Sequence, residues 1–278
     1  MSLIIFAHAN SFPASTYSLL FRSLRSRGHA VRAIEKFGHD ARYPVTSNWP
    51  NLVQQLADFA APEIASHGRG AWLVGHSLGG FLSLMCAARH PDLGGHAVRG
   101  VILLDSPVLG GWRARTLELI KRTQLVGSIS PGRISRQRRN HWKDATTAFE
   151  HFARKQAFAR WDPHVLRDYI THGTHDEQTP QGHRRVLSFD RDIETAIYNT
   201  LPHNLDRLLR RHPLQCPVGF IGGTHSLEMQ QVGMTMTHKL VGNHPERLQM
   251  MEGSHLFPME RPQETASAID TLLQVLQL

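Results

Sequence analysis

Apolar and polar positions along the chain fall into blocks that predict strands and helices in turn. Short apolar runs, typical of strands buried on both faces, occupy residues 3–7, 30–34, 71–74, 98–104, 217–221 and 247–251. Apolar residues recur at helical spacing within residues 17–24, 52–64, 81–89 and 262–276. Strands that alternate with helices favour a mostly parallel, doubly wound sheet with helices on both faces.

The middle of the chain follows a different pattern. Residues 107–213 lack a comparable pair of strands, and the spacing of their aromatic and aliphatic residues predicts helices. We therefore predict an α/β core formed by residues 1–106 and 214–278, with residues 107–213 inserted as a helical lid. A length of 278 residues fits one such fold and does not require two independent domains.

Composition predicts a soluble cytoplasmic protein. No run approaches the roughly 18 consecutive apolar residues of a membrane span, and no basic region precedes residues 3–7, as it would in a secretory signal. The two cysteines, Cys86 and Cys216, are too few for a disulfide framework and too far apart for a metal or redox pair. We expect two buried, reduced thiols.

The net charge of +8 is concentrated in the predicted lid. Residues 107–213 hold 19 Lys and Arg against 11 Asp and Glu, and the densest run is 133–143. Such a run is usually a solvated helical face. Nucleic-acid binding is not favoured, because no helix-turn-helix, zinc-finger or RNA-recognition pattern accompanies the charge. The basic lid would also suit a substrate that carries a carboxylate or a phosphate.

A candidate nucleophile lies between the strand at 71–74 and the helix at 81–89. The motif Gly75-x-Ser77-x-Gly79 is weak as a bare pattern, but a sharp strand-to-helix turn gives it a mechanical reason. Small residues on both sides let the chain turn, and the serine projects from the carboxyl end of the sheet. The alternative is a glycine-rich turn with a capping serine.

Serine needs a base, and the base needs an acid that fixes its tautomer. Of 19 histidines, His255 follows the last strand and precedes the last helix, the position that a base requires. Two N–H donors should stabilise the oxyanion. We assign them to the backbone of Leu78 and of Asn10, which lies in the loop after the first strand.

Together these residues resemble the α/β-hydrolase superfamily. The sequence His8-Ala9-Asn10 looks like that superfamily's His-Gly-x oxyanion loop, with Ala9 in place of glycine. The resemblance implies a substrate-binding role for this loop, a serine mechanism, and no metal or organic cofactor. Family members with an aspartate nucleophile resemble the chain as well, but Ser77 argues against their chemistry.

The acid departs from the family pattern. In most members it follows the penultimate strand, where this chain has His225 and Ser226. Two carboxylates remain as candidates. Asp105 ends the strand after the nucleophile's helix, a position from which some members supply the acid, and Glu228 lies slightly beyond the usual position. We favour Asp105, although an aspartate there could also cap a turn.

The family's first strands form a second departure. An antiparallel hairpin normally precedes the oxyanion-loop strand, whereas this sequence starts with that strand. The sheet therefore lacks its first two strands or the start is late. An edge exposed in this way could pair with a second copy, so a homodimer is a hypothesis.

The resulting prediction is hydrolysis of a small ester or related acyl compound through an acyl-Ser77 intermediate. Carbon–carbon bond, thioester and amide hydrolysis use the same serine machinery, and the sequence does not separate them. The alternative from another class is a non-catalytic ligand-binding protein that keeps the pocket without turnover.

Overall fold

The computed structural model describes residues 1–108, 131–180, 182–242 and 244–277. Its centre is a six-stranded sheet in the order β11-β10-β6-β3-β1-β2, and every pairing in it is parallel. The strands are β1 (Leu3–Ala7), β2 (Ala30–Ala33), β3 (Trp72–His76), β6 (Gly100–Leu104), β10 (Val218–Gly223) and β11 (Leu248–Met251). Each predicted strand run overlaps one of these strands, and the predicted fold class is confirmed.

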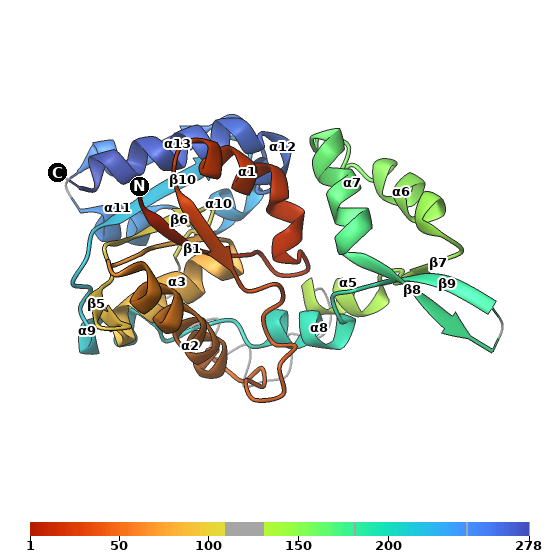
Figure 1. Ribbon diagram of the computed structural model, residues 1–278, viewed down its shortest axis with the longest axis horizontal. Coiled ribbons are helices and arrows are strands. Elements are labelled where there is room, and N and C mark those ends of the chain that lie inside the picture. The colour runs from red at the N-terminus through yellow and green to blue at the C-terminus, as the bar shows by residue number, and fades with distance from the viewer. Residues whose placement is uncertain (109–130, 181, 243, 278) are drawn as a thin grey trace.

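Helices cover both faces of the sheet (Figure 1). On one face lie α1 (Ser18–Ser26) and α13 (Pro262–Val275), and on the other lie α2 (Pro50–His67) and α3 (Leu78–Arg89). Successive residues of β1 serve different faces, because side chains alternate along a strand. Ile4 packs in the hydrophobic cluster of α1 and α13, whereas Ile5 packs in that of α2 and α3. This two-sided burial explains the uninterrupted apolar runs of the sequence.

The other core elements are short. They are the 3₁₀ helices η1 (Ala14–Tyr17) and η3 (Pro245–Arg247), the strands β4 (Asp92–Leu93) and β5 (His96–Ala97), and the helices α9 (Leu205–Arg211), α10 (Leu227–Val232), α11 (Thr235–Val241) and α12 (Phe257–Glu260). Cys86 is buried and Cys216 half-buried, and both are free thiols. Within the described ranges, no helix is both long and apolar enough to cross a membrane.

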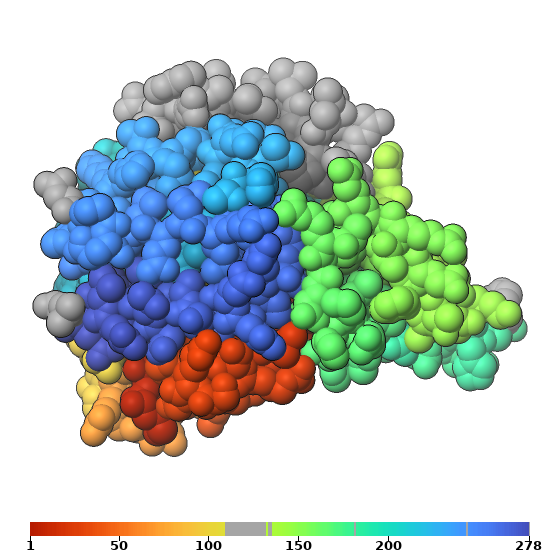
Figure 2. All heavy atoms as spheres, turned by 90° about the horizontal axis from the view of Figure 1, so that it is seen from above, coloured from red at the N-terminus to blue at the C-terminus, as the bar shows by residue number. Residues whose placement is uncertain are grey.

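Residues 131–199, here called the cap, form a lobe at one side of the core (Figure 2). The cap contains α5 (Pro131–Gln137), β7 (His141–Trp142), α6 (Ala145–Ala153), α7 (Pro163–His172), β8 (Thr174–Thr179), β9 (Gly182–Leu187) and α8 (Arg191–Asn199). Residues 109–130, also part of the predicted lid, lie outside the described residues.

The sequence predicts a helical lid, but the cap also includes the antiparallel sheet β7-β9-β8. Strands β8 and β9 are largely polar, and most of their residues are exposed or half-buried. They therefore lack the apolar alternation by which a half-buried strand is recognised. The end of the predicted lid also packs with the core, since Leu205 and Leu208 of α9 belong to the cluster of α2 and α3.

Aromatic side chains join the cap to the core. Phe12, in the loop after β1, lies 5.4 Å from Trp161, 5.7 Å from Tyr169 and 6.3 Å from Phe158 between ring centroids. Aromatic rings combine large buried area with directional edge-to-face contacts. The cap is thereby anchored on the loop that follows β1, at the carboxyl end of the sheet.

Candidate active site

Ser77 occupies the sharp turn between β3 and α3. Its backbone lies in a region that L-residues rarely adopt, with φ of +52° and ψ of −115°. The flanking glycines make this turn feasible. A Cβ on Gly75 would collide with the carbonyl of Gly79, and a Cβ on Gly79 would collide with the carbonyl of Ala7 in β1. The motif is therefore required by backbone packing and leaves the serine at the end of the sheet.

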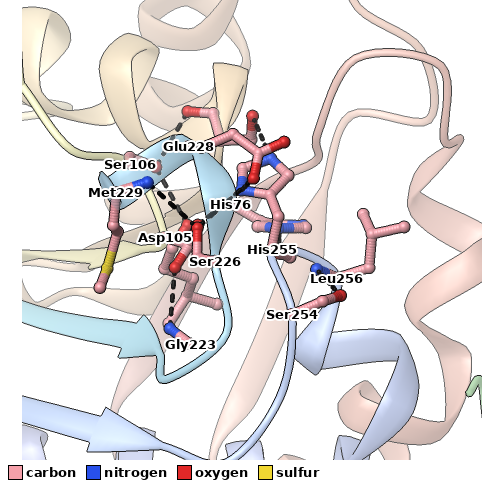
Figure 3. A network of polar contacts seen from close by, with 12 residues as sticks. His76, Asp105, Ser106, Gly223, Ser226, Glu228, Met229, Ser254, His255 and Leu256 are labelled. Carbon is pink, nitrogen blue, oxygen red and sulfur yellow. Dashed lines mark hydrogen bonds and ion pairs between the residues drawn. The ribbon is translucent and has the colours of Figure 1, made fainter. Parts of the chain in front are cut away.

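His255 connects Ser77 to Asp105. The distance from His255 Nε2 to Ser77 Oγ is 3.0 Å, and that from Nδ1 to Asp105 Oδ2 is 2.6 Å. Figure 3 shows the imidazole and the Asp105 carboxylate facing one another between the ends of different strands. Because a carboxylate only accepts, Nδ1 carries the hydrogen, and Nε2 is free to accept from the serine hydroxyl.

Asp105 is held more firmly than Glu228. Its side chain is fully buried, and it accepts hydrogen bonds from the Gly223 N–H at 2.8 Å and from Ser226 Oγ at 2.6 Å. Glu228 is half exposed, and its carboxylate lies 3.9 Å from His255 Nδ1. Ser226, one of the two residues at the place where the family pattern would put the acid, thus donates to the carboxylate of the neighbouring strand.

The electrostatic environment favours an ionised aspartate and a basic imidazole. Burial by itself would raise the pKa of Asp105, but the hydrogen bonds and charge of His255, with those of Ser226 and Gly223, bring this pKa below its usual value. Burial likewise opposes protonation of His255, yet the hydrogen bond and charge of Asp105 raise its pKa above 6.5. The pair is arranged so that His255 can take up a proton.

The structure assigns His8 a different role from the one expected, because it is fully buried and does not line the cavity described below. Its Nδ1–H donates to the Ala9 carbonyl at 2.8 Å, and its Nε2 accepts from the Phe37 N–H at 3.0 Å. Burial lowers the pKa of His8 to about 4, which keeps it neutral. His8 therefore supports the predicted oxyanion loop from behind, while Asn10 lines the cavity and Leu78 directly follows Ser77.

A hydrogen-bonded chain that sequence reasoning missed links this loop to the His255 loop. The Ala9 N–H donates to the Tyr17 hydroxyl at 3.1 Å, and that hydroxyl donates to His76 Nδ1 at 2.7 Å. His76 Nε2–H then donates to the His255 carbonyl at 2.8 Å. Burial lowers the pKa of His76 to about 3, so it is neutral. The only sequence signal was a histidine at the variable position before Ser77.

A cavity of about 650 Å³ lies between the core and the cap, and Ser77 is part of its wall. Its wall combines apolar and polar side chains, as is usual for small-molecule sites. The lining residues are Ala9, Asn10, Ser11, Phe12, Ser77, Arg138, Gln156, Ala157, Phe158, Arg160, Glu194, Tyr198, His225, Leu227, Glu228, Ser254, His255, Leu256 and Glu260. The space accommodates a small substrate.

Among the described residues, one group has the ligand types for a metal ion. Asp105, Glu228 and His255 each offer one ligand atom, and these atoms lie within 4.8 Å of one another. Asp105 Oδ2 and His255 Nδ1 are, however, already hydrogen-bonded to each other. A metal ion there would have to break the contact that orients the imidazole, so this group fits the proton-transfer arrangement better than a metal centre.

The chain belongs to the alpha/beta hydrolase family, whose model matches residues 4–268. A search of curated proteins finds no match. Among solved structures, E-2-(acetamidomethylene)succinate hydrolase is similar, with 22% identity, a TM-score of 0.63 and coverage of 98% of this chain and 91% of that one.

Two further solved structures are similar over most of their length. The thioesterase domain from the curacin biosynthetic pathway has 19% identity and a TM-score of 0.66, over 96% of this chain and 90% of that one. An esterase of M. tuberculosis has 20% identity and a TM-score of 0.63, over 98% and 84%. At these identities the likeness shows a shared fold.

Proposed function

We propose that this member of the family is a serine hydrolase that cleaves a small ester or related acyl compound through an acyl-Ser77 intermediate. The observation that carries the proposal is the position of His255, with Nε2 3.0 Å from Ser77 Oγ and Nδ1 2.6 Å from Asp105 Oδ2. A nucleophile, a base and an orienting acid at hydrogen-bond distance are the requirement for activating a serine hydroxyl.

In the proposed reaction, His255 Nε2 takes the proton of Ser77 Oγ while the oxygen attacks the substrate's carbonyl carbon. The backbone N–H groups of Leu78 and Asn10 would stabilise the resulting oxyanion. The tetrahedral intermediate collapses, the C–O bond to the alcohol breaks, and His255 protonates the departing alcohol. Water, deprotonated by the same imidazole, then attacks the acyl carbon and releases the acid and free Ser77.

Asp105 would remain ionised throughout this cycle. Its burial and its hydrogen bonds from Gly223 and Ser226 hold the carboxylate in place, so that Nδ1 of His255 keeps its hydrogen. Thioester or carbon–carbon bond cleavage would use the same groups, and the names of similar structures include a thioesterase domain and an esterase. We place ester hydrolysis first because it needs no group beyond Ser77, His255, Asp105 and two N–H donors, and the test below includes thioesters beside esters.

The proposal is tested with a panel of p-nitrophenyl esters with acyl chains of two to eight carbons, and with the matching acyl thioesters. Ser77→Ala and His255→Ala should abolish turnover, because each removes a group that bonds or transfers a proton in the reaction. Ser83→Ala is the matched control, since Ser83 is a buried serine of α3, the helix that Ser77 precedes, and does not line the cavity. Its activity should equal that of the wild type.

Fluorophosphonate labelling supplies a second readout that does not depend on the substrate. The Ser77 oxygen attacks phosphorus and fluoride leaves, so the wild type and Ser83→Ala should be labelled and Ser77→Ala should not. A wild type that is inert toward all esters and thioesters and is not labelled would refute the hydrolase proposal and favour a non-catalytic ligand-binding protein.

A further inference from the structure

The cap side of the cavity contains a buried ion pair that the proposed reaction does not use. Arg138 Nη1 donates to Glu194 Oε1 at 3.1 Å, and both side chains line the cavity that holds Ser77. Glu194 is only 3% exposed and Arg138 19% exposed. Ser11 Oγ also donates to Glu194 Oε1, at 2.5 Å, and Asn10 Nδ2 donates to the Glu194 backbone carbonyl at 3.1 Å. The pair is thus built against the predicted oxyanion loop.

Several polar atoms of this cluster are left over. Arg138 Nε and Nη2, Glu194 Oε2 and Asn10 Oδ1 are buried, and none makes a hydrogen bond of good geometry with the described residues, although the buried Tyr169 hydroxyl interacts with the Arg138 guanidinium. Glu194 and Asn10 are more than nine-tenths buried. Unpaired buried polar groups are costly and are therefore rare in folded proteins, so several together in a cavity wall require an explanation. They call for a partner that both accepts and donates hydrogen bonds.

The charges of the cavity wall indicate that this partner is not an anion, and the leftover N–H donors of Arg138 require that it also offers an acceptor. Its described part carries two arginines and three glutamates. Arg138 is paired with Glu194, and Arg160 lies 3.8 Å from Glu260. A substrate carboxylate would meet no unpaired cation there and would add a negative charge beside a buried glutamate. The basic composition of the predicted lid, which would suit an anionic substrate, is therefore not carried into the cavity.

We propose that Asn10, Arg138 and Glu194 form a polar subsite that binds an uncharged donor–acceptor group of the substrate, a primary amide or a hydroxyl. Its carbonyl or hydroxyl oxygen would accept from the Arg138 guanidinium, and its N–H or O–H would donate to Glu194 Oε2 or Asn10 Oδ1. This inference rests on the proposed hydrolase function and specifies its substrate class.

The test compares matched esters that differ only at the far end. On the acyl side, p-nitrophenyl heptanoate is compared with the p-nitrophenyl monoesters of adipamic acid, 6-hydroxyhexanoic acid and adipic acid. On the alcohol side, butyrate esters of pentanol, 4-hydroxybutanamide and 1,4-butanediol are followed by acid release. In at least one series, the amide or hydroxyl ester should exceed the apolar ester by about 10-fold or more in kcat/KM, while the carboxylate ester should not.

Two variants locate the preference. In Arg138→Gln and Glu194→Gln the ratio of kcat/KM between the polar and the apolar ester should fall toward one. Arg139→Gln is the matched control, because Arg139 is the exposed neighbour and lies outside the cavity wall, and it should keep the wild-type ratio. Circular dichroism melting curves identify any variant that fails to fold. In that case, the ratio of kcat/KM measured for the other variant tests the subsite.

The outcomes separate this inference from the proposed function. Hydrolysis of all esters at equal rates would overturn the subsite and leave the hydrolase intact. A preference for the carboxylate ester would overturn the charge argument, and a polar preference retained in both variants would mean that recognition lies elsewhere. Absence of both hydrolysis and fluorophosphonate labelling would instead refute the hydrolase itself.

Discussion

The replacement of Asp105 by asparagine is the sharpest test of the proposed mechanism. The new side chain keeps one oxygen, which can still accept from the Gly223 N–H, but it presents an NH₂ group where Oδ2 now faces His255 Nδ1. Two donors cannot face each other, so the imidazole would adopt the other tautomer, with its hydrogen on Nε2. Nε2 could then no longer accept the proton of Ser77.

The expected loss in kcat is about 10⁴-fold, the size found when the triad aspartate of a serine protease becomes asparagine. At 1.36 kcal/mol for each factor of ten, this equals about 5.4 kcal/mol of transition-state stabilisation. Glu228→Gln is the comparison, because Glu228 lies 3.9 Å from the same nitrogen and is half exposed. Screening by water limits such a contact, so its activity should stay within about 3-fold.

The assay is steady-state hydrolysis of the best p-nitrophenyl ester, with melting curves to show that both variants are folded. The reasoning would be refuted if Glu228→Gln lost orders of magnitude while Asp105→Asn remained within about 10-fold. That result would make Glu228 the acid and Asp105 a buried structural carboxylate.

Three further results are expected. The acidic limb of the pH profile of kcat/KM should have its midpoint above pH 6.5, because His255 must be neutral to act as base and its pKa is raised. In Asp105→Asn the midpoint of the residual activity should move to lower pH, since burial of the imidazole then has the largest effect on its pKa. A midpoint that does not move would contradict this. Tyr17→Phe removes the donor to His76 and should lower kcat by about 10-fold with little change in KM. If Tyr17 and His76 act together, the double variant with His76→Asn should lose less activity than the product of the two single losses. Independent losses would count against the hydrogen-bonded chain. Gly79→Ala should lower the melting temperature or prevent folding, because its Cβ would collide with a backbone carbonyl of β1, and a wild-type melting curve would rule that clash out.

The sequence predicted the α/β core well because burial on both faces leaves a direct trace in the sequence. Each strand of the six-stranded sheet is a nearly continuous apolar run, and Ser77 and His255 follow two of these runs at the ends where ligands bind. Their assignment as nucleophile and base remains a prediction, as does that of Asp105. The structure adds that His255 lies within hydrogen-bond distance of both Ser77 and Asp105.

What the sequence did not reveal depends on contacts between distant residues. The strands of the cap are polar and exposed, so no periodicity marks them. Tyr17 and His76 are 59 residues apart, and Arg138 and Glu194 are 56 apart. Such pairs are created by the packing of one element on another, and neither partner differs locally from any other tyrosine, histidine or arginine.

The contact between Ser226 and Asp105 bears on how such enzymes can diverge. Both side chains converge from adjacent strands on one point beside His255, and Ser226 Oγ already bonds the same oxygen that the imidazole binds. If aspartate stood at position 226 and serine at 105, the donor and the acceptor would trade places without a change of fold. A lineage could make that exchange in two substitutions. It could pass through a form with aspartate at both positions, in which the two carboxylates would share a proton. Which of the two strands carries the acid would then reflect ancestry and not a difference in the reaction.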